Sequence, residues 1–102
     1  MNQLQTEIGE WGVATFGKNQ TPKALISHIV KETIELQLAH NLENEIEECS
    51  DIFILLCGIA HQRGFDLMQE ARNKFEVIKK RKWGEPDSEG VIQHVKERQG
   101  GC

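Results

Sequence analysis

Residues 45–63 read EIEECSDIFILLCGIAHQR, and the run from 52 to 60 within them is apolar throughout. Gly64 follows, a residue that commonly ends a helix. A helix at a protein surface shows one apolar stripe, whereas a helix that is apolar on every side must be covered on every side. A chain of 102 residues has few other helices to supply that cover. The segment therefore predicts a helical core that is completed by association with further copies of the chain.

Three more helices are expected around this segment, with approximate bounds of 4–14, 22–40 and 67–82. Thr21 and Pro22 form a favourable start for the second of them, because threonine caps a helix and proline fits its first turn. Asp66, with Gln69 three residues later, resembles a capping box at the start of the last one. Residues 41–44 are expected to link the helix that begins at Pro22 to the apolar one.

We expect one all-α domain over residues 1–102, a four-helix bundle with its helical core over about 4–82 and a tail over 83–102. In the tail, residues 91–98 have room for one or two further helical turns. The longest apolar run has nine residues, whereas a bilayer span needs about 20, so no membrane segment is expected. Three cysteines without a CxxC pair indicate reduced thiols in the cytoplasm. The net charge of -4 argues against a nucleic-acid polymer as partner.

Two pairs of acidic residues stand at helical spacing, Glu32 with Glu35 and Glu48 with Asp51. Residues three apart on a helix share one face, about 5–6 Å from each other, so each pair forms a clamp of two carboxylates. The short link makes the two helices neighbours, and the four carboxylates then converge beside their apolar faces. Like charges in such surroundings stay ionised only when a cation neutralises them. Oxygen ligands favour Mg²⁺ or Mn²⁺ in that position.

Two other interpretations of these acidic residues remain. Glutamates at helical spacing are often a solvated surface, and the run of acidic residues between 43 and 48 contributes to that interpretation. A di-iron carboxylate site is the other, but such sites use Glu-x-x-His pairs on their helices. None of the four histidines has a glutamate three residues before it. Among metal sites, the pattern therefore favours a hard, redox-inert cation.

Six of the twelve basic side chains fall between residues 72 and 82. Lys74 and Arg81 share one face of the last predicted helix, and a lysine and an arginine so spaced can hold two successive phosphate groups. A carboxylate metal site combined with such a clamp is what cleavage of a polyphosphate needs, because the metal acidifies a bound water and the cations steady the leaving pyrophosphate. The alternatives are an exposed basic helix end and a nucleic-acid or nuclear-targeting patch at residues 79–82.

These segments resemble the MazG-like nucleoside triphosphate pyrophosphohydrolases. Residues 31–35 (KETIE) and 48–51 (ECSD) are similar to the paired ExxE and ExxD motifs of that family. Further similarity is to its short branch, the dATP/dGTP diphosphohydrolases, which are often encoded by phages. It extends from about residue 11 to residue 95 and lies in residues 15–17, 28–29, 63–64, 74–83 and 91–95.

The resemblance implies an all-α bundle completed as a homodimer or homotetramer in the cytoplasm of a bacterial or phage-infected cell. The implied reaction splits a nucleoside triphosphate into monophosphate and pyrophosphate with Mg²⁺ or Mn²⁺, and purine deoxynucleotides are favoured. Glu35 or Glu48 would orient or deprotonate the water, and Lys74 and Arg81 would bind phosphate. The implied metal ligands are Glu32, Glu35, Glu48 and Asp51.

The chain departs from the family pattern at two positions. Lys31 stands where a second glutamate is common, and it becomes a further candidate for phosphate binding. Ile78 stands where an asparagine is common, so one polar contact to the nucleotide is missing. Trp11 and Phe16 are candidates for stacking on the base, since a flat aromatic face suits a purine, or else are core residues. His28 contacts phosphate or sugar, or else accepts a hydrogen bond in the core.

A second interpretation of the chain needs no catalysis. A helical interaction module would bind a basic partner through its acidic face, or a nucleic acid through its basic helix end. An enzyme of the expected kind gains thermal stability with Mn²⁺ and a deoxynucleotide, because a ligand that binds only the folded state stabilises it. An adapter ignores both ligands.

Overall fold

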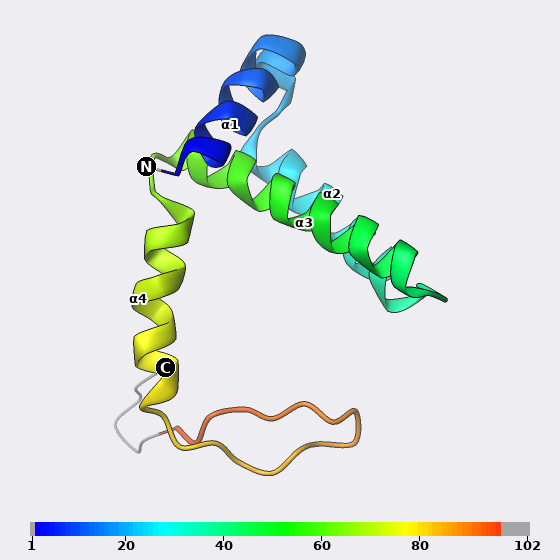
Figure 1. The fold of residues 1–102 in the computed structure, drawn as a ribbon, viewed down its shortest axis with the longest axis vertical. Helices are drawn as coiled ribbons and strands as arrows, with labels where there is room; N and C mark the ends of the chain where they lie inside the picture. Colours follow the sequence, from blue (N-terminus) through cyan, green and yellow to red (C-terminus); the bar gives the residue numbers. More distant parts are fainter. Residues whose placement is uncertain (1, 97–102) are drawn as a thin grey trace. The chain divides into compact units, whose positions relative to one another are not determined.

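The computed structural model describes residues 2–96, and within them the chain is all-helical (Figure 1). Those residues form no strand, only a single bridge between Trp83 and His94. The predicted all-α class with four α-helices is therefore confirmed. The chain divides into two compact units, one ending at Glu70 and the other beginning at Ala71. The helices are α1 (Gln3–Phe16), the short 3-10 helix η1 (Gly17–Asn19), α2 (Pro22–Gln37), α3 (Leu42–Arg63) and α4 (Leu67–Lys79).

The helix ends follow local side-chain chemistry. The Thr21 hydroxyl accepts a hydrogen bond from the N–H of Ala24 at 3.1 Å and so caps α2, with Pro22 in its first turn. Gly64 ends α3 with φ 78°, a left-handed conformation that glycine adopts without strain. Asp66 Oδ1 accepts from the N–H of Gln69 at 3.2 Å and starts α4. These starts and ends agree with those predicted from the sequence.

Three predicted boundaries are wrong. Helix α3 begins at Leu42, because the side chain of Asn41 caps it through the N–H of Asn44 at 2.9 Å, and the link to α2 is correspondingly earlier. Helix α2 ends at Gln37, three residues before the predicted end. Helix α4 ends at Lys79, not at residue 82.

The tail also differs from the sequence expectation. Residues 91–96 are not helical, and residues 97 and 98 lie outside the described part of the chain. Two backbone hydrogen bonds hold the two arms of this loop together, from Gly84 N–H to the Gln93 carbonyl at 2.9 Å and from Val95 N–H to the Lys82 carbonyl at 2.7 Å. Pairing across the loop thus satisfies backbone groups that a helical turn would have satisfied internally.

In the unit that ends at Glu70, α3 packs against both α1 and α2. Glycines allow the close approach: a β-carbon on Gly9 of α1 would overlap the ring of His61, and one on Gly58 would lie 3.3 Å from Leu25 Cδ1. The side chain of Gln5 is buried and ties α1 to the turn after α3, donating to the Phe65 carbonyl at 2.7 Å. Packing is therefore closest where the apolar half of α3 meets the other two helices.

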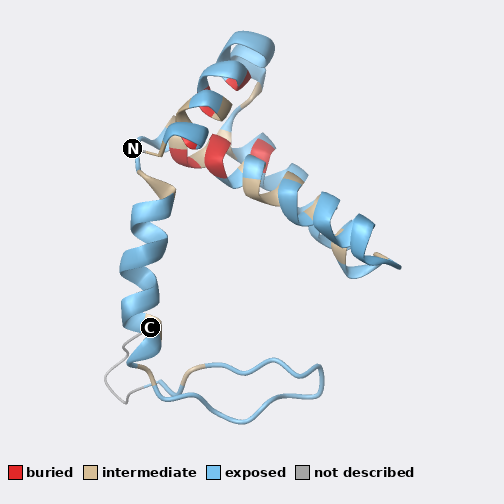
Figure 2. Cartoon of the chain, in the orientation of Figure 1, coloured by how far each residue is buried: buried red, intermediate tan, exposed pale blue. Residues whose placement is uncertain are grey.

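Much of the apolar surface of α2 and α3 is not covered within the described chain (Figure 2). Along α2 and the residue that caps its end, four apolar side chains at a spacing of four residues are each more than half exposed: Ile26, Val30, Ile34 and Leu38. On α3, Leu42 is 70% exposed and Ile46 is 58% exposed. We call these six side chains the apolar stripe. In a single copy of the chain, apolar side chains of α3 therefore remain exposed, although the sequence predicts that this helix is covered on every side.

Two further expectations can be compared with the structure. Cys49 is exposed and Cys57 is buried, and both are free thiols, while Cys102 lies outside the described residues. Burial raises the pKa of the Cys57 thiol, which keeps it protonated. Over residues 2–96, no helix has the length and apolar character needed to cross a membrane.

Candidate active site

Helices α2 and α3 bring acidic side chains together where they pack side by side. One carboxylate oxygen from each of Glu32, Glu48 and Asp51 lies within 4.8 Å of the other two. All three residues are half-buried, whereas Glu35, one turn further along α2, is exposed and stands outside this group. The structure therefore brings three of the four predicted ligands together, with the fourth beside them.

The electrostatics of this acidic cluster show a shortage of positive charge. A hydrogen bond with Glu32, burial and the charges of the neighbouring carboxylates together raise the pKa of Glu48 to about 7. The same hydrogen bond lowers the pKa of Glu32, and repulsion by Glu32 raises the pKa of Glu35. Glu48 Oε1 is buried and makes no hydrogen bond among the described residues. An all-carboxylate donor set with an unpartnered oxygen fits a hard divalent cation such as Mg²⁺ or Mn²⁺.

His28 borders the cluster on α2. Its Nε2 lies 3.2 Å from Glu32 Oε1, and its side chain is 56% exposed against 13% for Glu32. Exposure excludes the interpretation of His28 as a core hydrogen-bond acceptor. Its ring reaches from the acidic cluster into the pocket described next.

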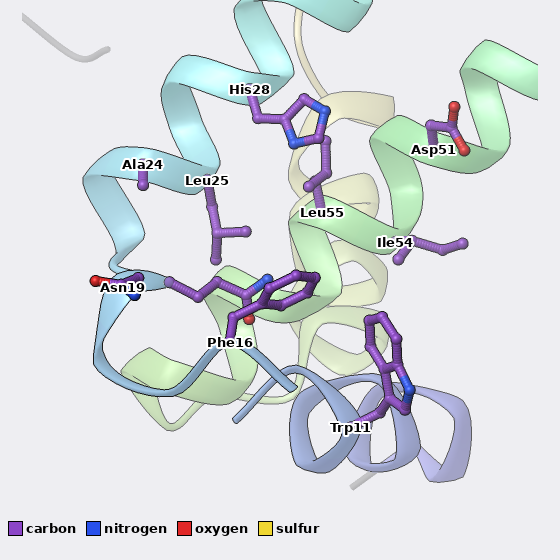
Figure 3. Close-up of a pocket in the computed structure, with 10 residues that line it drawn as sticks. Trp11, Phe16, Asn19, Ala24, Leu25, His28, Asp51, Ile54 and Leu55 are labelled. Atoms are coloured by element: carbon purple, nitrogen blue, oxygen red, sulfur yellow. The ribbon is translucent and has the colours of Figure 1, made fainter. Parts of the chain in front are cut away.

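A pocket of about 490 Å³ adjoins the acidic cluster (Figure 3). His28 and Asp51 lie on one side of it, and the rings of Trp11 and Phe16 lie on the other. These two rings meet edge to face with their centroids 5.4 Å apart. Trp11 is 63% exposed and Phe16 is 46% exposed, so neither is a core residue in the described chain. The other lining residues are Asn19, Gln20, Ala24, Leu25, Ile54 and Leu55.

In the unit that begins at Ala71, positive charge gathers around His94. Arg81 Nη1 lies 3.5 Å from His94 Nδ1, and His94 Nε2 is buried without a hydrogen bond among the described residues. Burial lowers the pKa of His94, and the charges of Arg81, Lys96 and Lys74 lower it further. Arg81 lies beyond the end of α4, so the predicted shared helix face with Lys74 is wrong. The charges of Arg81 and Lys74 nevertheless both lower the pKa of His94.

The basic run at residues 79–82 does not form one uniform cationic face. Lys79 Nζ lies 2.9 Å from Glu76 Oε2 and 5.1 Å from the centroid of the Phe75 ring. Lys31, on α2, is exposed. Lys79 therefore contacts Glu76 and Phe75 and is not one of the cations that lower the pKa of His94.

Residues 4–100 match the model of the dATP/dGTP pyrophosphohydrolase family. The chain belongs to this family. The match covers nearly the whole sequence, and it confirms both the family and the hydrolase class that the motifs indicated.

A curated protein and a solved structure, both from cyanophage S-2L, resemble the chain. The dATP/dGTP diphosphohydrolase of cyanophage S-2L is 27% identical over 93 residues, which make up 91% of this chain and 86% of that protein. A solved structure of a cyanophage S-2L MazG-like pyrophosphohydrolase, bound to dGDP and three catalytic Mn²⁺ ions per active site, superposes with a TM-score of 0.77. Its identity is 24%, and the match covers 93% of this chain and 92% of that one. This likeness confirms the MazG-like fold.

Two polar residues that line the pocket of this chain, Asn19 and Gln20, were not identified from the sequence. They stand in the turn between α1 and α2 and carry no motif. The only available signal was their position, two carboxamides in a short link directly before the helix that supplies Glu32.

Without metal, the protein is expected to lose thermal stability as pH rises from about 4.5 to about 7. Glu48 has its ordinary pKa of 4.5 when unfolded and a pKa of about 7 when folded, so the folded state holds its proton more tightly. This contribution is complete below pH 4.5 and is lost as pH passes 7. The lowered pKa of Glu32 acts only below 4.5, outside this window. Melting curves in EDTA across the window measure the slope.

The variant Glu48→Gln is the matched control, because it keeps the shape of the side chain and cannot titrate. We expect its melting temperature to vary much less over the same pH window. Saturating Mn²⁺ is expected to flatten the slope of the unmodified protein as well, because the cation replaces the proton as the neutralising charge. A melting temperature that rises with pH in EDTA would contradict the assignment.

Proposed function

We propose that the chain hydrolyses the purine deoxynucleotides dATP and dGTP to the monophosphate and pyrophosphate, with Mg²⁺ or Mn²⁺ as cofactor. The observation that carries the proposal is the group of three carboxylates within 4.8 Å, one of which, Asp51, also lines a pocket with two aromatic rings. Family membership supports the reaction class, and the cyanophage structure with dGDP and Mn²⁺ supports both ligands.

The metal ions are proposed to be held by Glu32, Glu35, Glu48 and Asp51. When bound, such ions neutralise phosphate oxygens and acidify water. Glu48 contributes an oxygen that no other described group satisfies. Glu35 is exposed and outside the closest group, so it is the carboxylate best able to orient the attacking water and take its proton.

The nucleoside is proposed to occupy the pocket, with its base against Trp11 and Phe16. The rings of Trp11 and Phe16 are exposed and already meet edge to face, so they offer an apolar surface to the base at little entropic cost. His28, between the pocket and Glu32, is proposed to contact sugar or phosphate. Lys74, Arg81 and Lys31 are proposed as phosphate-binding cations, and the positive charge around His94 supports the first two.

Homo-oligomerisation is proposed as part of the functional state. The apolar stripe on α2 and α3 exposes six large side chains, four of them at a regular spacing of four residues, which is not the single scattered exposure that is ordinary on a protein surface. A second copy of the chain offers an equally apolar surface, because a two-fold interface pairs the same patch on both subunits. Either a dimer or a tetramer built from such dimers would cover the stripe.

A panel of all four dNTPs and the corresponding NTPs, assayed singly for pyrophosphate release, tests the proposed reaction. We expect dATP and dGTP to be turned over in Mg²⁺ or Mn²⁺, the pyrimidine deoxynucleotides at least about tenfold less efficiently, and nothing to be released in EDTA. Monophosphate must appear in equal amount to pyrophosphate, since water adds across the α–β anhydride. Release of orthophosphate instead, or no turnover of any nucleotide, would overturn the proposal and leave the interaction module as the better explanation.

A further inference from the structure

The turn between α1 and α2 places a fixed carboxamide at the pocket. Gln20 lines the pocket. Its backbone is held at both polar groups, because its carbonyl accepts a hydrogen bond from Gln62 Nε2 on α3 and its N–H donates to the Gly17 carbonyl at 3.4 Å. The backbone from which the Gln20 side chain extends is therefore anchored to two other elements.

The side chain of Gln20 lies over a glycine of α1. A β-carbon added to Gly12 would overlap Oε1 of Gln20. Gly12 is buried, and the three atoms nearest to that position all belong to the Gln20 carboxamide, Oε1 with Cδ at 3.4 Å and Nε2 at 3.6 Å. The missing side chain at Gly12 thus provides the place in which the carboxamide rests. Within residues 2–96, the hydrogen bonds of Gln20 are those of its backbone, and its carboxamide has no hydrogen-bond partner.

The neighbouring asparagine is not equivalent. Asn19 ends η1 and also borders the pocket, but Figure 3 shows its carboxamide turned away from Phe16 and Trp11. The remaining polar groups of the pocket, His28 and Asp51, belong to the side of the acidic cluster. Gln20 is therefore the polar side chain that serves the part of the pocket away from the acidic cluster.

We propose that Gln20 reads the edge of the purine base and so determines nucleotide specificity, an inference that rests on the proposed function. A carboxamide presents one donor and one acceptor side by side, and a half-turn of the amide exchanges them. One side chain can therefore pair with the amino group and ring nitrogen of adenine or with the carbonyl and ring N–H of guanine. A pyrimidine has a single ring, and with its phosphates at the acidic cluster we expect its edge not to reach Gln20.

The variant Gln20→Met tests this proposal, because methionine keeps the length of the side chain and removes both polar groups. We expect kcat/KM for dATP and dGTP to fall about tenfold, equivalent to about 1.4 kcal/mol, through KM and not kcat. The values for dCTP and dTTP are expected to stay within about twofold of wild type. A readout without turnover accompanies it: affinity for dGMP falls by a similar factor, while affinity for dCMP and for Mn²⁺ alone is unchanged.

Two more variants separate the role of Gln20 from general damage to the pocket. Lys18→Ala changes an exposed side chain of η1 that does not line the pocket, and it is expected to leave the purine preference intact. Gly12→Ala is expected to displace the carboxamide and reduce the purine preference in the same direction as Gln20→Met. Its melting temperature should equal or exceed that of wild type, because alanine favours a helix over glycine.

The outcomes distinguish this inference from the function on which it rests. If the wild-type protein releases no pyrophosphate from any dNTP, the proposed function fails. If the wild type prefers purines and Gln20→Met retains the same purine-to-pyrimidine ratio, the function stands and the role of Gln20 is overturned. Loss of the preference in Lys18→Ala alone would likewise overturn it.

Discussion

Glu32→Ala and Asp51→Ala are each expected to lower kcat for dGTP by about a thousandfold or more, the scale of effect that follows the loss of a catalytic charge. Each removes one oxygen from a group that spans only 4.8 Å, so the remaining carboxylates cannot hold a cation in the same place. The same variants should melt at a higher temperature than wild type in EDTA. Each deletes one of the charges that the other carboxylates repel, and the pKa of Glu35 reports that repulsion, because the charge of Glu32 raises it most and the charge of Asp51 also raises it.

The opposite directions of these two effects make the test specific. A mutation that merely damages the fold lowers both activity and stability, whereas loss of a metal ligand lowers activity and relieves repulsion. Glu47→Ala is the matched control, since Glu47 is an exposed neighbour on α3 outside the cluster, and both quantities should stay near wild type. Pyrophosphate release and thermal melting measure them.

Metal binding can be measured independently of turnover, by thermal melting. Wild type is expected to gain several degrees of melting temperature with Mn²⁺ and dGTP together, and Asp51→Ala to gain almost none. Wild-type turnover of every dNTP in both Glu32→Ala and Asp51→Ala would show that the metal site is elsewhere. Absence of any Mn²⁺ effect on the unmodified protein would favour an adapter.

Helical spacing is the reason that the acidic cluster could be predicted. The positions of Glu32, Glu48 and Asp51 follow from the period of an α-helix and from a short link, both of which are local properties of the sequence. Arg81 could not be placed in this way. It follows α4, whose regular helix ends at Lys79 at the start of four consecutive cations, and it reaches His94 through the pairing of the loop arms.

The pocket could not be predicted from local patterns, because tertiary packing makes it. Gln20 enters it only because Gly12 lies opposite on α1 and Gln62 on α3 holds its backbone. These residues are eight and 42 positions away in sequence, and none belongs to a periodic motif. For the same reason the sequence left open whether Trp11 stacks on a base or is a core residue, since an aromatic residue on an amphipathic helix is usually a core residue.

The apolar stripe leads to the second large effect, on assembly. Ile34→Glu is expected to convert the oligomer into a monomer and to lower the melting temperature by more than about 10 °C. Burying one isoleucine contributes about 1.5–3 kcal/mol, and a two-fold interface loses that contribution from both copies and also acquires two facing charges. In the single chain Ile34 is 52% exposed, so a protein that functions as a monomer would tolerate glutamate there.

Val77→Glu provides the control for this assembly test. Val77 is 47% exposed on α4, comparable with Ile34, but it does not belong to the apolar stripe on α2 and α3. Sedimentation velocity over a dilution series should give the same oligomer for wild type and Val77→Glu and a monomer for Ile34→Glu. The melting temperature of wild type should also rise with protein concentration, because association stabilises only the folded state. A wild-type protein that sediments as a stable monomer at micromolar concentration would refute the assembly, and the exposed side chains of α2 and α3 would then need another partner.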